Sequence, residues 1–271
     1  MDVVMLSRLR RTRDKTTITW TVKMPIDEKS RLIVDAEVES LRRSVIPICG
    51  EDARRRPYLV GSAVVLVWRG RKVLVTAQHV LDDNLKVPLF FFGEDGCSRP
   101  FGGAFEVSET HDLAAKLLPS DEIAALSHVP FLREDVVERA APVGERFYAS
   151  VAGYPATAAK RKDRVTLDTP MEVYSNFATE EIGGHVSVIF NKKEGAASET
   201  GHGIARDPVG KSGGAIFGLR SVGPHIKPDQ TARLVGVPTR WNRDEKAIRG
   251  PSAAILVRLL DNLVGMCAGR E

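Results

Sequence analysis

Short runs of β-forming residues, separated by glycine, proline, asparagine or aspartate, dominate the chain from residue 58 onward. The clearest two runs are 58–68 and 72–77, and the Arg69-Gly70-Arg71 link between them predicts a β-hairpin with a glycine-containing turn. Further runs follow at 87–92, 113–118, 147–153, 165–173, 185–190, 215–219 and 234–237. Many short strands with little helix between them favour β-barrels or sandwiches over a parallel α/β sheet. We therefore expect an all-β fold.

Helices are expected near the two ends of the chain, and a helical turn is expected around Val80 to Asp83. Residues 27–44 carry apolar side chains near helical spacing among charges, and Pro47 is expected to end this amphipathic helix. Its apolar positions are Leu32, Ile33, Ala36, Val38, Leu41 and Val45. Residues 253–267 predict a closing helix. Residues 1–25 are basic with weak periodicity and are interpreted as a disordered tail or a loosely attached strand, and residues 191–202 are polar and glycine-rich, which predicts a mobile loop.

Composition excludes several classes of function. With 271 residues, 43% hydrophobic and 27% charged, the chain has enough apolar side chains for a sizeable core. The net charge of +4 comes from short basic clusters without interleaved aromatic residues, so a nucleic-acid partner is not expected. The three cysteines, Cys49, Cys97 and Cys267, lie far apart without metal-site spacing, which predicts neither a disulfide framework nor a metal site. No apolar run matches a signal peptide or a membrane span, so we expect a cytoplasmic protein.

Three local strings together suggest nucleophilic catalysis. Ser212 lies between glycines in the segment 210–214, His79 follows the strand-like run 72–77, and Asp112 precedes the apolar run 113–118. Serine is a weak nucleophile until a base takes its proton, and an imidazole with a pKa near ~6.5 can do so. A carboxylate on the far ring nitrogen fixes the tautomer and stabilises the imidazolium. Each string alone also fits a glycine-rich turn, a structural histidine or a strand-starting aspartate, but their conjunction predicts Ser212 as nucleophile, His79 as base and Asp112 as the orienting acid.

The order of these residues bears on a rival fold. The segment 210–214 also matches the G-x-S-x-G elbow of α/β-hydrolases, which place an acid and then a histidine after the serine. The only histidine after Ser212 is His225, and no aspartate or glutamate lies between them. The β-rich pattern disagrees with an α/β-hydrolase as well.

The strings T-A-x-H, D-L-A and G-x-S-G-G, in that order, resemble those of trypsin/chymotrypsin-like serine proteases. The closest resemblance is to stand-alone bacterial trypsin-like peptidase domains. It covers residues 44–260 and includes Gly153-Tyr154-Pro155, which is similar to a segment of the second barrel. The resemblance implies a double antiparallel β-barrel with the active site in the cleft between barrels, and an oxyanion hole made by the backbone N–H groups of Gly210 and Ser212. His79 and Asp112 would then belong to the first barrel.

The resemblance also implies a division of the chain. Residues 1–43 form a basic N-terminal extension with the amphipathic helix, and residues 44–271 form the trypsin-like domain. Within that domain the barrels span about 44–135 and 136–250, and the C-terminal helix follows.

Several positions depart from the family pattern. Secreted trypsins carry an acid just before the catalytic serine, which pairs with a newly cut N-terminus, but this chain has Lys211. The position that sets charge preference in trypsins falls on Arg206, with Asp207 beside it; the Asp207-Pro208 step also fits simple turn chemistry. The segment 236–241 resembles the strand that pairs with substrate, although Pro238 lacks an N–H. The candidate substrate-binding residues are Arg206, Asp207, Thr239, Arg240 and Trp241.

The leading hypothesis from the sequence is a serine endopeptidase that passes through an acyl-enzyme and needs no cofactor. A protein or peptide is its expected substrate. The family resemblance further implies an activating or effector protein as partner, with residues 1–40 as a docking element. The alternative hypothesis is a protease-like binding module that is catalytically dormant until a partner binds.

Overall fold

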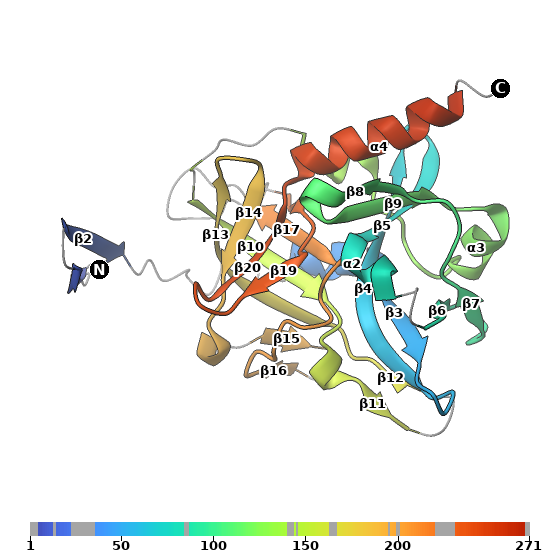
Figure 1. Ribbon diagram of the computed structural model, residues 1–271, viewed down its shortest axis with the longest axis horizontal. Helices are drawn as coiled ribbons and strands as arrows, with labels where there is room; N and C mark the ends of the chain where they lie inside the picture. Colours follow the sequence, from blue (N-terminus) through green and yellow to red (C-terminus); the bar gives the residue numbers. More distant parts are fainter. Residues whose placement is uncertain are drawn as a thin grey trace.

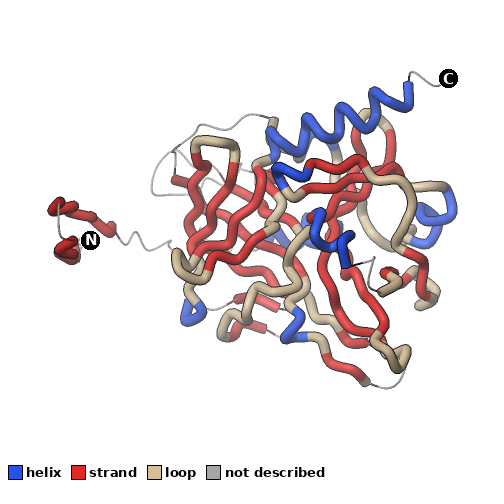
Figure 2. The backbone as a smooth tube through the Cα atoms, viewed as in Figure 1, coloured by secondary structure: helices blue, strands red, loops and turns tan. Residues whose placement is uncertain are grey.

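The computed structural model describes residues 5–12, 15–22, 36–83, 87–139, 144, 146–162, 167–194, 196–198, 201–219 and 231–268. Strands dominate these residues, as the sequence predicts (Figures 1 and 2). The strands of the first half are β1 (Met5–Thr12), β2 (Lys15–Val22), β3 (Val45–Glu51), β4 (Pro57–Trp68), β5 (Arg71–Ala77), β6 (Leu89–Phe92), β7 (Ser98–Pro100), β8 (Glu106–Ser108) and β9 (Leu113–Leu117). Those of the second half are β10 (Arg146–Gly153), β11 (Lys160–Arg161), β12 (Leu167–Asp168), β13 (Glu172–Glu181), β14 (His185–Ile189), β15 (Ala196–Ser198), β16 (Gly201–Gly203), β17 (Ala215–Leu219), β18 (Arg233–Gly236), β19 (Arg240–Asn242) and β20 (Ala247–Pro251). The α-helices are α2 (Gln78–Asp82), α3 (Ser120–Ala125) and α4 (Ala253–Ala268), and short 3-10 turns occupy Arg42–Ser44, Glu109–His111, Glu134–Val136, Ala156–Ala158 and Lys192–Glu194.

The first sheet has seven antiparallel strands in the order β7-β6-β3-β4-β5-β9-β8. Its centre is the predicted hairpin, in which Trp68 pairs with Arg71. Arg69 and Gly70, the two residues of the turn, both have positive φ angles, 46° and 75°. Such a turn matches the right-handed twist of the strands it joins. The predicted hairpin is therefore confirmed.

The second sheet follows the path β18-β17-β10-β13-β14-β20-β19, and β15 and β16 extend it from β13. Strands β10 and β13 pair along their whole lengths, so that Gly153 at the end of β10 lies opposite Glu172 at the start of β13. The mobile loop predicted over 191–202 contains strand residues in its described part, because β15 pairs with β16 there. Two curled antiparallel sheets with few helices make this an all-β double-barrel fold.

Helix α4 closes the structure by lying across both sheets (Figure 1). Leu256, Leu260 and Leu263 recur on one helical face and pack into the core cluster that contains strand residues of both sheets. This apolar spacing confirms the predicted C-terminal helix. Because one helix covers residues from both sheets, it couples the two halves of the molecule.

The N-terminal segment differs in part from its prediction. Strands β1 and β2 form a two-stranded sheet that lies apart from the two large sheets (Figures 1 and 2). Of the helix expected over 27–44, residues 36–41 are helical, and residues 23–35 lie outside the described part of the chain. Val45 and Pro47 belong to β3 rather than to the helix or its end. Val45 is buried, because its apolar side chain belongs to the hydrophobic core.

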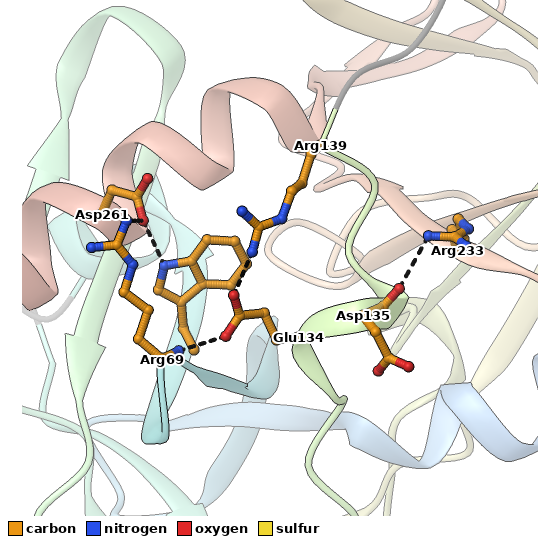
Figure 3. Close-up of polar contacts among 7 residues, drawn as sticks. Arg69, Glu134, Asp135, Arg139, Arg233 and Asp261 are labelled. Carbon is orange, nitrogen blue, oxygen red and sulfur yellow. Dashed lines mark hydrogen bonds and ion pairs between the residues drawn. The ribbon is translucent and has the colours of Figure 1, made fainter.

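A polar network ties α4 to the β4–β5 hairpin (Figure 3). The buried indole of Trp68 donates to Asp261 Oδ1 at 2.9 Å, and Arg69 reaches the same carboxylate at 2.9 Å. Glu134 accepts a hydrogen bond from the backbone N–H of Arg69 at 2.7 Å and pairs with Arg139. These contacts join the β4–β5 hairpin to α4 and to the segment that contains Glu134 and Arg139.

Candidate functional site

His79 and Asp112, predicted as base and orienting acid, lie in direct contact. His79 Nδ1 is 2.8 Å from Asp112 Oδ2 and 3.1 Å from Oδ1. A carboxylate only accepts hydrogen bonds, so Nδ1 is the ring nitrogen that donates to Asp112, and Nε2 is the nitrogen that faces away from it. The side chain of His79 is 45% exposed, whereas that of Asp112 is 24% exposed.

The backbone at the start of α2 holds the Asp112 carboxylate in place. The N–H of His79 donates to Asp112 Oδ1 at 3.0 Å, and the N–H of Gln78 donates to the Asp112 carbonyl at 3.1 Å. Asp112 itself has left-handed backbone angles, φ 53° and ψ 44°, a conformation that aspartate tolerates better than most residues. Burial raises the pKa of Asp112, but hydrogen bonds from His79 outweigh burial and hold the pKa below its ordinary value. The carboxylate is therefore ionised at neutral pH.

The serine loop, residues 210–214, packs against the end of β5, the strand that leads to His79. A Cβ placed on Gly213 would lie 2.1 Å from the Ser62 carbonyl oxygen, 2.3 Å from Thr76 Oγ1 and 2.9 Å from the Ala77 nitrogen. Only a glycine fits so close to another backbone, and its φ of 83° also favours glycine. His79 follows Ala77 by two residues and Ser212 precedes Gly213 by one. The fold thus packs Gly213 against Thr76 and Ala77, at the end of the strand that leads to His79.

Ser62, which the sequence analysis did not single out, joins the two sheets behind this loop. Its N–H donates to the Ser212 carbonyl at 2.8 Å, and its hydroxyl donates to the Gly210 carbonyl at 2.9 Å. The same hydroxyl accepts the N–H of Tyr154 at 3.0 Å, and the Tyr154 hydroxyl donates to the Val45 carbonyl at 3.1 Å. A buried serine in the apolar run 58–68 was the available signal, but its partners are distant in the sequence.

The amides of Gly210 and Ser212 differ from those of the neighbouring residues in the serine loop. The Lys211 N–H donates to the Pro208 carbonyl at 2.9 Å, and the Gly213 N–H donates to the Pro238 carbonyl at 2.8 Å. Among the described residues, neither the Gly210 nor the Ser212 N–H has a hydrogen-bond acceptor. Two such amides, two residues apart in one loop, can receive an anionic oxygen.

The direction of the Gly210 amide follows from the peptide that contains it. The Val209 carbonyl accepts the Ala156 N–H at 2.8 Å. In a trans peptide the N–H points opposite to the carbonyl, so the Gly210 N–H points away from Ala156. A φ of 95° at Gly210 permits this orientation.

Lys211 is buried although it carries a charge, with 1% of its side chain exposed. Its Nζ lies 2.8 Å from Oε1 of Glu172, whose side chain is 6% exposed. The N–H of Arg206 points at the same carboxylate, 3.4 Å from Oε1 and 3.3 Å from Oε2. Glu172 was not predicted as a site residue; a single acid in the apolar segment 171–174 was the only signal.

The predicted substrate-binding residues have different surroundings. Asp207 Oδ1 accepts the Val209 N–H at 3.2 Å, as expected from turn chemistry, and its other oxygen lies 3.8 Å from Arg243. Thr239 is buried, and Trp241 packs edge-on against Phe190 with ring centroids 4.8 Å apart. Arg206 is half-buried and Arg240 is exposed. Their roles in substrate binding stay predictions.

In the described part of the chain, no group of three or more histidine, cysteine or acidic side chains is placed to hold a metal ion. Nor does any helix within the described ranges have the length and apolar character needed to cross a membrane.

The fold and the site define an all-β protein of two curled sheets, with a histidine–aspartate pair on one sheet and a glycine-bounded serine loop on the other. No family model matches the sequence, and no curated protein matches it. Among solved structures, the chain is similar to one from work on aromatic interactions in the coupled folding and binding of the intrinsically disordered Sesbania mosaic virus VPg protein, with a TM-score of 0.47, 14% identity and coverage of 78% of this chain and 85% of that chain. It is also similar to the MamO protease domain from Magnetospirillum magneticum, with a TM-score of 0.43, 14% identity and coverage of 82% and 97%.

Proposed function

We propose that this protein is a serine endopeptidase in which Ser212, His79 and Asp112 act as nucleophile, base and orienting acid. The observation that supports the proposal is the packing of Gly213, next to Ser212, against Ala77, which precedes His79 by two residues, together with the 2.8 Å contact between His79 and Asp112. A reactive serine needs a base whose far nitrogen is held by a carboxylate, and the pair meets that need.

The proposed reaction has two stages. His79 Nε2 takes the proton of Ser212 Oγ as that oxygen attacks the peptide carbonyl, and the resulting imidazolium is stabilised by Asp112. The imidazolium then protonates the leaving amine, the C–N bond breaks, and an acyl-enzyme remains. Water, activated by His79, hydrolyses this ester and restores the serine hydroxyl.

The N–H groups of Gly210 and Ser212 form the proposed oxyanion hole. They are the loop amides without an acceptor in the described residues, and the Gly210 N–H direction is set by the Val209–Ala156 hydrogen bond. Each such donor typically contributes about 3–4 kcal/mol to transition-state stabilisation. No cofactor is needed for this chemistry. The proposed substrate is a protein or peptide in the cytoplasm, and limited proteolysis of a partner protein is the proposed outcome.

Labelling with a fluorophosphonate tests the proposal, since the probe phosphonylates only an activated serine. Wild-type protein is expected to gain one adduct, mapped to Ser212 by mass spectrometry, and to cleave an unfolded protein substrate. Ser212→Ala and His79→Ala are expected to lose both properties. Ser98→Ala, which changes an exposed serine in β7, is the matched control and is expected to behave as wild type.

One observation favours the alternative of a dormant binding module. Among the described contacts, no hydrogen bond joins the His79 ring to the Ser212 hydroxyl. Such bonds are often long before substrate binds, so we retain the peptidase as the main proposal. Folded wild-type protein that neither labels nor cleaves would favour the binding module.

A further inference from the structure

The buried Lys211–Glu172 ion pair has a place in the fold that connects it to catalysis. Lys211 lies between Gly210 and Ser212, whose N–H groups form the proposed oxyanion hole. Its side chain leaves the loop, crosses in front of Gly153 and reaches Glu172 on β13. A Cβ on Gly153 would lie 3.0 Å from the Lys211 Cα and Cβ, so glycine at this position gives the lysine stem its path.

The register of β10 and β13 explains why the lysine finds its partner there. Gly153 is the residue opposite Glu172 on the neighbouring strand. The pair is nearly closed to water, with exposed fractions of 1% for Lys211 and 6% for Glu172, and their charged atoms are 2.8 Å apart. Burial holds the pKa of Lys211 below its ordinary value, and the Glu172 carboxylate offsets part of that effect. A charge this deeply buried needs its partner.

Glu172 also restrains a second segment. Both of its oxygens lie within 3.4 Å of the Arg206 N–H. Arg206 begins the stretch that runs through Asp207 to the serine loop, and it occupies the position expected to set charge preference. One carboxylate therefore holds both the entry to the serine loop and the residue next to the nucleophile.

We propose that Glu172 and Lys211 are positioning residues that hold the oxyanion loop in its donor geometry without cleavage of the chain. In secreted trypsins, an acid at the position of Lys211 pairs with a newly cut N-terminus. Here the charges are reversed, and both come from inside the folded domain. The inference rests on the proposed peptidase function, because it assigns the pair a part in forming the oxyanion hole.

The test compares the rate of fluorophosphonate labelling with stability in urea. Lys211→Met is expected to label roughly 100-fold more slowly than wild type at urea concentrations where the variant is fully folded, as for loss of one oxyanion donor. The control is Lys116→Met, because Lys116 is also buried, pairs with Glu122 at 2.7 Å and lies in the first sheet. It is expected to lose stability but to label within threefold of wild type. Lys211→Met that labels at the wild-type rate would overturn the inference.

Two further measurements keep the test decisive. If Lys211→Met does not fold, the double variant Lys211→Met with Glu172→Gln removes both charges and avoids an unpaired one. Slow labelling by this folded double variant supports a positioning role, and wild-type labelling refutes it. If wild-type protein does not label at all, the proposed peptidase fails. Hydrogen exchange over residues 208–214 then tests the pair alone: faster exchange in the double variant but not in Lys116→Met supports the inference, and unchanged exchange overturns it.

Discussion

Replacing Gly213 with alanine tests the contact that brings the two sheets together at the site. A Cβ at this position would lie 2.1 Å from the Ser62 carbonyl oxygen, 2.3 Å from Thr76 Oγ1 and 2.9 Å from the Ala77 nitrogen. Two costs combine. Alanine at a φ of 83° lowers the free energy of unfolding by about 1–2 kcal/mol, because the left-handed backbone is unfavourable for it. Forcing an extra methyl group into a packed interior lowers it by roughly another 1–3 kcal/mol.

The matched control is Gly96→Ala. Gly96 has a similar φ of 71°, but a Cβ there would meet nothing within 4 Å. It pays only the backbone cost of about 1–2 kcal/mol. The difference between the two variants therefore isolates the crowding at Gly213.

Urea unfolding followed by circular dichroism measures the two free energies of unfolding. We expect Gly213→Ala to be about 1–3 kcal/mol less stable than Gly96→Ala. Relief of the overlap moves the serine loop away from Thr76 and Ala77, so its fluorophosphonate labelling is also expected to fall at least tenfold while Gly96→Ala labels normally. Equal stabilities and equal labelling rates would refute the close packing from which the site is inferred.

Three other predictions concern acid stability, thiol reactivity and the C-terminal helix. The pKa of Asp112 is lowered from 3.8 in the folded protein, so ionised Asp112 stabilises the fold above pH 3.8, and this stabilisation is lost as the pH falls through the folded-state pKa. His79→Ala removes the side-chain hydrogen bond that helps to lower this pKa and so weakens the stabilisation. Acid unfolding of the variant, followed by circular dichroism, is therefore expected to begin at a higher pH than that of wild type. Coincident acid curves would contradict this. Iodoacetamide at pH 8 is expected to modify the exposed Cys97 but not Cys49, because burial raises the pKa of the Cys49 thiol to about 12. Peptide mass mapping measures the modification of each cysteine. Equal labelling of the two would contradict the burial of Cys49. Asp261→Ala leaves the indole N–H of Trp68 without its acceptor (Figure 3). The free energy of unfolding, measured in urea, is expected to fall by about 1–3 kcal/mol. An unchanged unfolding midpoint would show that this hydrogen bond does not stabilise the protein.

Local sequence signals predicted those features that depend on residues close together in the chain. The two β-forming runs and the turn at Gly70 predicted the β4–β5 hairpin, and the apolar spacing after residue 253 predicted α4. A hairpin turn and a helical face each depend on residues that are close together in the chain. The N-terminal helix boundary was predicted less well. Val45 continues the helical spacing, but burial in the first sheet places it in β3. Packing across the sheet outweighed a weak local periodicity.

The sequence by itself determined the chemical types in the candidate site: a histidine after a buried strand, an aspartate before another and a serine between glycines. Only the tertiary structure decided how they are supported. Ser62 joins the two sheets through partners about 90 and 150 residues away, and no short pattern encodes such contacts. The interpretation of Lys211 differs most between the sequence and the structure. In the sequence it is a departure from the trypsin pattern, whereas in the fold the register of β10 and β13 places Glu172 within 2.8 Å of it. A buried charge is tolerated only with a partner, and strand pairing, a long-range property, supplies that partner.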